Sequence, residues 1–254
     1  MPDPVTALPA GARSRRDRPA STLLAIDTAG SLCSAAVACD GTVLAAERRV
    51  MRHGHGEALL PMIERVMAGA RLLPPQLDAV AVSVGPGGFT GIRVGLAAAR
   101  GIALAIRARL VGVSSFEAVA ARVAAARGDR GETLLVALDS RRADLYVQLF
   151  APDAAVPLAA PQALLPDRLA DVVTSLAASA PLLIAGDAAA AASAALGGRA
   201  CCTIAADSAP DAEGVAAAAL RQLRCAAPAA PVRPLYLRSP DVTQPPRRGT
   251  GAAP

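Results

Sequence analysis

The sequence predicts an α/β protein built from two related halves. The runs 22–27 (TLLAID) and 133–139 (TLLVALD) resemble each other, and each is an apolar strand pattern that ends in an aspartate before a turn. A second strand pattern and then helical patterns follow each run. One short similarity can arise by chance, but the shared order of elements after it favours a duplicated α/β unit.

The first half contains strand and helix patterns in close succession. They are strands at 22–27, 33–39 and 42–49, a helix at 57–70, a strand at 79–84, a helix at 92–106, a strand at 110–113 and a helix at 116–126. Asp40-Gly41, between the second and third strands, is a strong hairpin signal. Pro61 lies near the first turn of the first helix, where proline is tolerated.

The second half has a sparser pattern. Its elements are strands at 133–139 and 144–150, a helix at 167–178, a strand at 182–185, helices at 188–196 and 211–224, and a short extended segment at 234–238. The tails, 1–21 and 239–254, are rich in Pro, Gly and Arg. We expect both tails to be disordered.

The composition limits the classes of function. Of the 254 residues, 53% are hydrophobic but only 2% are aromatic, so Ala, Val, Leu and Ile must form the core. The scarcity of aromatic side chains argues against a base-stacking surface for single-stranded nucleic acid. The net charge is +5, but much of the basic excess lies in the two tails. It is therefore a weak indication of nucleic-acid binding.

The chain also lacks the signals of a membrane or secreted protein. No apolar run approaches the roughly 20 residues that span a bilayer, and the N-terminus has no charged-then-apolar signal pattern. We therefore expect a soluble, cytoplasmic protein. The cysteines have no Cys-x-x-Cys spacing, which favours buried free thiols over disulfides or a zinc site; they are Cys33, Cys39, Cys201, Cys202 and Cys225.

The loop between the 79–84 strand and the following helix is rich in glycine. Its glycines, which we predict to be structural, are Gly85, Gly87, Gly88 and Gly91. Glycine lets a backbone turn sharply and approach another group closely, and we expect Thr90 to be the N-cap of the helix. Such a loop can bind an anion, but a P-loop needs a lysine and the chain has none. The loop could also serve only to pack the strand against the helix.

Candidates for catalysis or metal binding are few. The only histidines, His53 and His55, would point about 200° apart on a helix, so a solvated loop is favoured over a metal site. No Ser-His-Asp or Cys-His pairing is evident. We predict no catalytic residue, no cofactor and no metal.

The two long helices of the first half have unusually broad apolar faces. On the first, the apolar positions are Leu59, Leu60, Met62, Ile63, Val66 and Met67. The second has a core face (Ile92, Leu96, Ala99, Ala103, Ile106), a face of small residues (Val94, Ala98, Gly101, Ala105) and an arginine ridge (Arg93, Arg100, Arg107). A helix that is apolar on two faces is normally covered on both, by a neighbouring helix of the same chain or by a partner. The ridge is most simply a solvated face, with partner carboxylates or tRNA phosphates as the alternative.

Several segments together resemble the bacterial TsaB family. They are LLAIDT (23–28), EALLPMI (57–63), VGPGGFTGIRVG (84–95), ALDSRRADLY (137–146) and PLYLR (234–238). The resemblance covers about residues 23–238 and implies the actin/sugar-kinase/heat-shock-ATPase fold in two related domains, the second one reduced. It also implies a dimerisation subunit of the complex that makes threonylcarbamoyladenosine next to the anticodon of tRNA.

On this basis we expect an N-terminal α/β domain at 22–127 with partner-binding helices and a reduced C-terminal α/β domain at 128–238. The implied partners are the catalytic paralogue TsaD, the ATPase TsaE and, indirectly, tRNA, with a homodimer when the chain is isolated. The resemblance favours a partner interface on the two helices, at Leu59, Leu60, Met62, Ile63, Met67, Val94, Ala97, Ala98 and Gly101.

Asp27 and Asp139 stand where ATPases of this fold hold a magnesium-bound phosphate network. The turn 28–31 partly fits a phosphate-binding hairpin, but the turn 140–144 has no glycine. We therefore favour a role of both aspartates as caps of strand ends. The alternative function is a nucleotide-binding phosphotransferase or hydrolase of the same fold.

Overall fold

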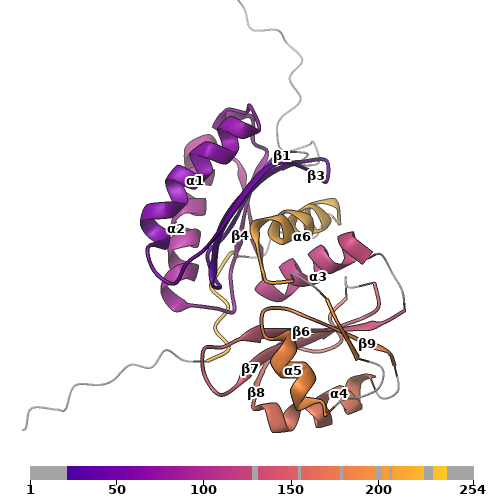
Figure 1. The fold of residues 1–254 in the computed structure, drawn as a ribbon. Coiled ribbons are helices and arrows are strands. Elements are labelled where there is room, and N and C mark those ends of the chain that lie inside the picture. Colours follow the sequence, from indigo (N-terminus) through magenta and orange to yellow (C-terminus); the bar gives the residue numbers. More distant parts are fainter. Residues whose placement is uncertain are drawn as a thin grey trace, which may run out of the picture.

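The computed structural model describes residues 22–127, 131–153, 156–177, 180–197, 202–205, 208–225 and 231–238. The two predicted tails lie outside the described residues. Two five-stranded sheets and three pairs of helices alternate through the molecule (Figure 1).

The first sheet has the strand order β3-β2-β1-β4-β5. Its strands are β1 (Thr22–Asp27), β2 (Leu32–Cys39), β3 (Thr42–Val50), β4 (Ala79–Ser83) and β5 (Arg109–Val113). β1, β2 and β3 pair antiparallel, and β1, β4 and β5 pair parallel. Asp40 and Gly41 form the predicted turn between β2 and β3, both with positive φ.

The second sheet repeats this arrangement. Its strands are β6 (Thr133–Asp139), β7 (Leu145–Phe150), β8 (Gln162–Leu164), β9 (Leu182–Ala185) and β10 (Cys202–Ile204), in the order β8-β7-β6-β9-β10. The antiparallel and parallel pairings are the same as in the first sheet. The predicted duplication is therefore confirmed. The short edge strands β8 and β10 were not predicted.

The helices form three layers around the sheets (Figure 1). α1 (His55–Gly69) and α2 (Phe89–Ile106) cover the outer face of the first sheet, and α4 (Leu169–Ala177) and α5 (Ala189–Ala195) cover that of the second. α3 (Ser115–Arg127) and α6 (Ala212–Arg224) lie between the sheets. Short 3₁₀ helices, η1 (Pro74–Gln76) and η2 (Pro166–Arg168), precede β4 and α4.

The middle layer joins the two halves of the chain. α6 comes from the second half, but it packs against the first sheet through residues such as Val215 and Ala219. α3 contacts both cores, with Ala118 in the first and Phe116 in the second. The predicted domain division after residue 127 stays a prediction.

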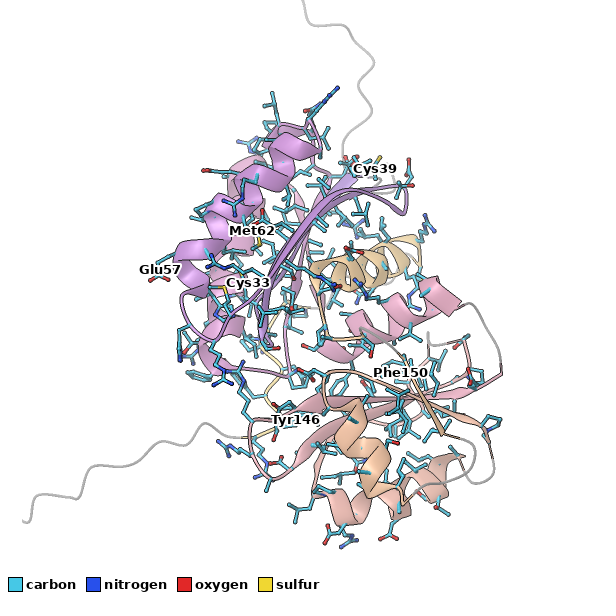
Figure 2. All side chains as sticks on the ribbon, viewed as in Figure 1. Cys33, Cys39, Glu57, Met62, Tyr146 and Phe150 are labelled. Atoms are coloured by element: carbon cyan, nitrogen blue, oxygen red, sulfur yellow. The ribbon has the colours of Figure 1, made fainter. Side chains whose placement is uncertain are left out.

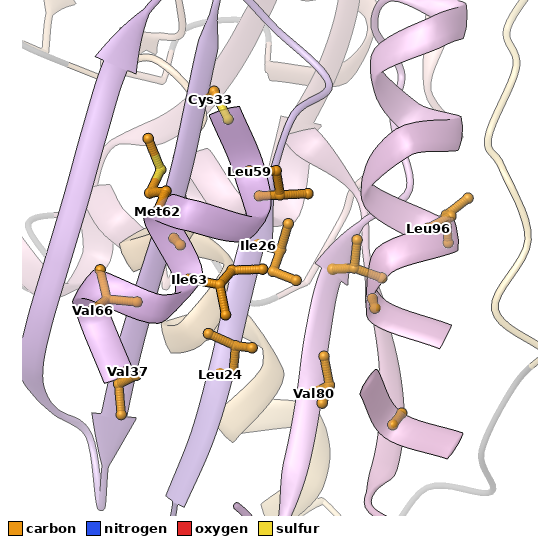
Figure 3. Close-up of a cluster of buried hydrophobic side chains, with 14 of the residues drawn as sticks. Leu24, Ile26, Cys33, Val37, Leu59, Met62, Ile63, Val66, Val80 and Leu96 are labelled. Carbon is orange, nitrogen blue, oxygen red and sulfur yellow. The ribbon is translucent and has the colours of Figure 1, made fainter. Parts of the chain in front are cut away.

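The core is mainly aliphatic, as the composition predicted, although Phe116 and Phe150 are fully buried in the core of the second half. In the first half, buried side chains of α1 and α2 meet those of β1, β2 and β4 (Figure 3). Figure 2 shows Met62 between α1 and the sheet, whereas Glu57 lies on the side of α1 that faces away from it. Of the cysteines with described side chains, Cys33 is buried, Cys39 is half-buried and Cys225 is exposed, and all three are free. The prediction of buried thiols is therefore wrong for Cys225.

The start of α2 differs from the prediction. The N-cap is Gly88, and Thr90 lies exposed within the first turn, so the prediction of Thr90 as N-cap is wrong. The backbone N–H of Gly88 donates to the carbonyl of Ala29 at 2.7 Å, and its own carbonyl accepts the first helical bond, from Ile92 N. The packing of the loop against the β1–β2 turn therefore sets where the helix begins.

Candidate functional site

A small cleft lies where the two halves meet. It has a volume of about 200 Å³, below the roughly 300–1,000 Å³ of typical small-molecule pockets. The β1–β2 turn, the glycine loop and the β6–β7 turn form its walls, together with Ser115 at the start of α3 and residues that precede α5 and α6. The alternative function considered from the sequence, a nucleotide-binding enzyme, would use this region, because the turn 28–31 and the glycine loop border it.

The glycine loop packs directly against the β1–β2 turn. A Cβ atom on Gly87 would lie 2.2 Å from the carbonyl oxygen of Ala29, and one on Gly91 would lie 2.0 Å from that of Thr28. The hydroxyl of Thr28 donates to the carbonyl of Gly91 at 2.7 Å. Only glycine permits such an approach of two backbones. The two glycines therefore pack the loop against the β1–β2 turn, and not the strand against the helix.

Asp27 and Asp139 cap the turns that follow their strands. Asp27 Oδ1 accepts a hydrogen bond from Ala29 N at 3.2 Å, and Asp139 Oδ1 accepts one from Arg141 N at 2.7 Å. Both bonds run from the aspartate to the residue two positions later, a local turn geometry typical of Asp. Asp27 is fully buried, and burial raises its pKa to about 6. The predicted capping role is confirmed for both residues.

Arg141 crosses the cleft from the second half to the first. It adopts a positive φ of 60°, and its guanidinium donates to the carbonyl of Gly30 at 3.0 Å. A Cβ on Gly88 would lie 3.6 Å from the same guanidinium, so the side chain also borders the glycine loop. The two turns that would surround a phosphate are thus joined by a protein side chain.

The histidines show no geometry for metal binding. His55 begins α1, where partial burial lowers its pKa, and His53 is exposed in the preceding loop. Among the described residues, no group of three or more His, Cys, Asp or Glu side chains could hold a metal ion.

The structure divides the predicted interface residues into two groups. Leu59, Met62, Ile63 and Met67 are buried in the core of the chain itself, with at most 7% exposure. Their prediction as partner-facing residues is wrong, because this stripe of α1 packs on the sheet. Val94 and Ala98 are half-buried, and Leu60, Ala97 and Gly101 are exposed; for these five the interface stays a prediction.

The exposed apolar surface of α1 and α2 includes a residue that was not predicted. Leu104 is 82% exposed and Leu60 is 53% exposed. Together with Ala97 and Gly101 they define what we call the outer face. By length and composition alone α2 could pass for a membrane span, and 28% of it is buried, but one such helix is weak evidence for a membrane. An apolar helix with so little cover favours a binding surface.

Comparisons with known proteins agree with this architecture. YeaZ from Pseudomonas aeruginosa aligns with 85% of this chain and 100% of its own, with a TM-score of 0.71 and 28% identity. The tRNA threonylcarbamoyladenosine biosynthesis protein TsaB of Escherichia coli is 36% identical over 124 residues. A family model described as TsaD, tRNA N6-adenosine threonylcarbamoyltransferase, matches residues 48–154.

In both sequence and fold the chain is similar to proteins of the TsaB (YeaZ) family. The E. coli alignment covers 49% of this chain and 52% of the relative, so the chain spans about half the length of the curated TsaB proteins it matches. A likeness in fold alone extends to component A of (R)-2-hydroxyglutaryl-CoA dehydratase from Acidaminococcus fermentans, with a TM-score of 0.52 and 12% identity. The expected actin/sugar-kinase/heat-shock-ATPase fold is confirmed.

Proposed function

We propose that this protein is a non-catalytic subunit in the biosynthesis of threonylcarbamoyladenosine in tRNA. It acts by binding a TsaD-like catalytic paralogue and by holding it competent for transfer to tRNA. In this role it is cytoplasmic, assembles with a TsaE-like ATPase and contacts tRNA only indirectly. The isolated chain forms a homodimer through the same surface.

The outer face of α1 and α2 is the observation that carries this proposal. Leu60 and Leu104 are large apolar side chains in solvent, and no atom lies within 4 Å of the position of a Cβ on Gly101. Small residues on a helix let a second helix approach closely, while the leucines supply apolar area to bury. A paralogue with helices in the same positions would fit such a surface, and the match of residues 48–154 to the TsaD family model supports that choice.

The features of the cleft argue against the alternative, a nucleotide-dependent enzyme. The cleft is small, Arg141 bridges it, and the glycine loop uses its backbone groups to contact the β1–β2 turn. Asp27 is fully buried and would need the cleft to open before it could reach a metal ion.

The test is co-elution of this chain with its TsaD-like paralogue in size-exclusion chromatography. Leu104→Asp should abolish co-elution and leave the melting temperature unchanged, because an exposed position tolerates a charge until a partner must cover it. Val156→Asp is the matched control, since Val156 is 54% exposed in the other half of the chain. Ile63, at first sight an equivalent target, is unsuitable because it is buried.

Co-elution of the Leu104→Asp variant at wild-type strength would contradict the proposal. Calorimetry with magnesium-ATP on the purified chain distinguishes the proposed non-catalytic subunit from the alternative, a nucleotide-dependent enzyme. Micromolar binding with turnover would favour the enzyme, whereas no binding is the result expected of a scaffold.

A further inference from the structure

The C-terminal segment Val232–Arg238, which we call the strap, crosses from one half of the molecule to the other. Val232 packs against the core of the first half, and Leu237 packs against that of the second. These two side chains are five residues apart, so at most about 17 Å of extended chain separates them. The strap therefore connects the two cores by a short and direct route.

The contacts of the strap with the first half involve backbone. Leu235 N donates to the carbonyl of Val84 at 2.7 Å, immediately before the glycine loop. A Cβ on Gly85 would lie 2.9 Å from the carbonyl oxygen of Leu235, and one on Gly112 would lie 3.0 Å from Val232 Cγ1. Both glycines therefore leave the space that the strap occupies.

Two arginines of the α2 ridge hold the strap. Arg100 Nη2 donates to the carbonyl of Val232 at 2.6 Å, and Arg93 Nε donates to the hydroxyl of Tyr236 at 3.3 Å. The guanidinium of Arg93 also lies 3.5 Å from the ring centroid of Phe89, which packs against the Tyr236 ring at 5.3 Å. Within the described part of the chain, Arg107 makes no such bond.

The end of the strap is anchored in the second half by an ion pair. Arg238 Nε lies 2.9 Å from Asp144 Oδ2, and Asp144 is only 2% exposed. A buried carboxylate is strongly destabilising without a charged or hydrogen-bonding partner. Asp144 directly precedes β7, so the anchor joins the strap to the second sheet.

We propose that the strap fixes the position of α2 relative to the second half of the chain, and so holds the outer face in the geometry that binds a partner. Arg93 and Arg100 are positioning residues for this strap rather than ligands for tRNA phosphates. The contacts above support the fixing of α2 by the strap, whereas the effect on partner binding rests on the proposed function.

The test is hydrogen exchange of the full-length protein, followed by mass spectrometry. In the Arg93→Ala/Arg100→Ala variant, amides of α2 and the glycine loop should exchange about tenfold faster, because charge-assisted bonds to the strap are lost. Arg107→Ala, from the same ridge, is the control and should exchange as the wild type does. Arg238→Ala should have a similar effect through the other anchor, with Arg233→Ala, an exposed strap residue, as its control.

Binding of the TsaD-like paralogue to the same variants tests whether the strap holds the outer face in its binding geometry. Affinity should fall about tenfold in both strap variants and stay unchanged in both controls, since a binding-competent conformation that is less populated binds more weakly. If the double variant does not fold, hydrogen exchange and affinity are both measured on the Arg238→Ala variant. Unchanged exchange in the strap variants would contradict the claim that the strap fixes α2. Faster exchange with unchanged affinity would contradict the claim that the strap affects partner binding. Absence of binding by the wild type would contradict the proposed function, while exchange still decides on the strap.

Discussion

The two halves of the molecule share one topology but differ in the helices that cover each sheet on the side away from α3 and α6. In the first half the outer helices α1 and α2 have 15 and 18 residues, and α2 carries the most exposed large apolar side chain of the described residues, Leu104. Their counterparts α4 and α5 have 9 and 7 residues. The duplicated strand order was thus kept in both halves, while the longer outer helices belong to the first half, where we propose the partner surface.

The halves also differ at the cleft. Asp27 is fully buried, whereas the equivalent Asp139 is exposed. Gly87 and Gly91 pack on the β1–β2 turn of the first half, whereas in the second half Gly186 approaches strand β6, where its Cβ would lie 2.0 Å from the carbonyl oxygen of Ala137. Each half thus uses glycine to bring the loop after its fourth strand close to its first strand or to the turn that follows that strand.

The largest expected effect is at the glycine loop. Gly91→Ala should lower the free energy of unfolding by more than about 3 kcal/mol, because the new Cβ would meet backbone that has little room to move. Gly101→Ala, in the same helix, has open space and should raise it by up to about 1 kcal/mol. Urea unfolding measures both. Similar values for the two variants would remove the packing role that we assign to the loop.

A second effect concerns the buried Asp27 and its dependence on pH. Because the pKa of Asp27 rises in the folded state from 3.8 to about 6, folding favours its protonated form. This contribution to stability is fully present below pH 3.8, is lost as the pH rises to about 6, and stays lost above that.

The Asp27→Asn variant has no ionisable carboxyl at this position. It should therefore be about 3 kcal/mol more stable than the wild type at pH 8 and nearly equal to it at pH 3. Urea unfolding across this pH range measures the difference. A constant difference at all pH values would contradict the burial argument.

The smallest effect concerns the bridge between the halves. Arg141→Ala removes the hydrogen bond to the carbonyl of Gly30 and should lower the free energy of unfolding by about 1 kcal/mol. The loss should be visible as faster hydrogen exchange in the β1–β2 and β6–β7 turns. Arg107→Ala is again the control. An Arg141→Ala variant with both turns as protected as in the wild type would argue that the halves are joined elsewhere.

Much of the fold could be predicted because the signal was local. The strands 133–139 and 182–185 were predicted with the observed bounds, since continuous apolar runs between turn residues mark them clearly. β8 and β10 have three residues each, too few for any periodicity. Their existence follows from pairing with β7 and β9, which a single sequence does not reveal.

The candidate site was harder, because it depends on contacts between distant residues. Leu59 and Leu60 are neighbours in the sequence, but only the packing of α1 on the sheet makes one 1% and the other 53% exposed. Leu104 fell between the faces assigned from helical spacing. Arg93 and Arg100 looked like a solvated ridge because their strap partners lie more than 130 residues further along the chain.

The most direct test of the central claim is hydrogen exchange of the chain with and without its TsaD-like paralogue. We predict slower exchange in α1 and α2 on complex formation, with α4 and α5 unchanged, because only the first pair presents the outer face. Protection confined to α4 and α5, or to the cleft, would contradict a partner surface on the first half.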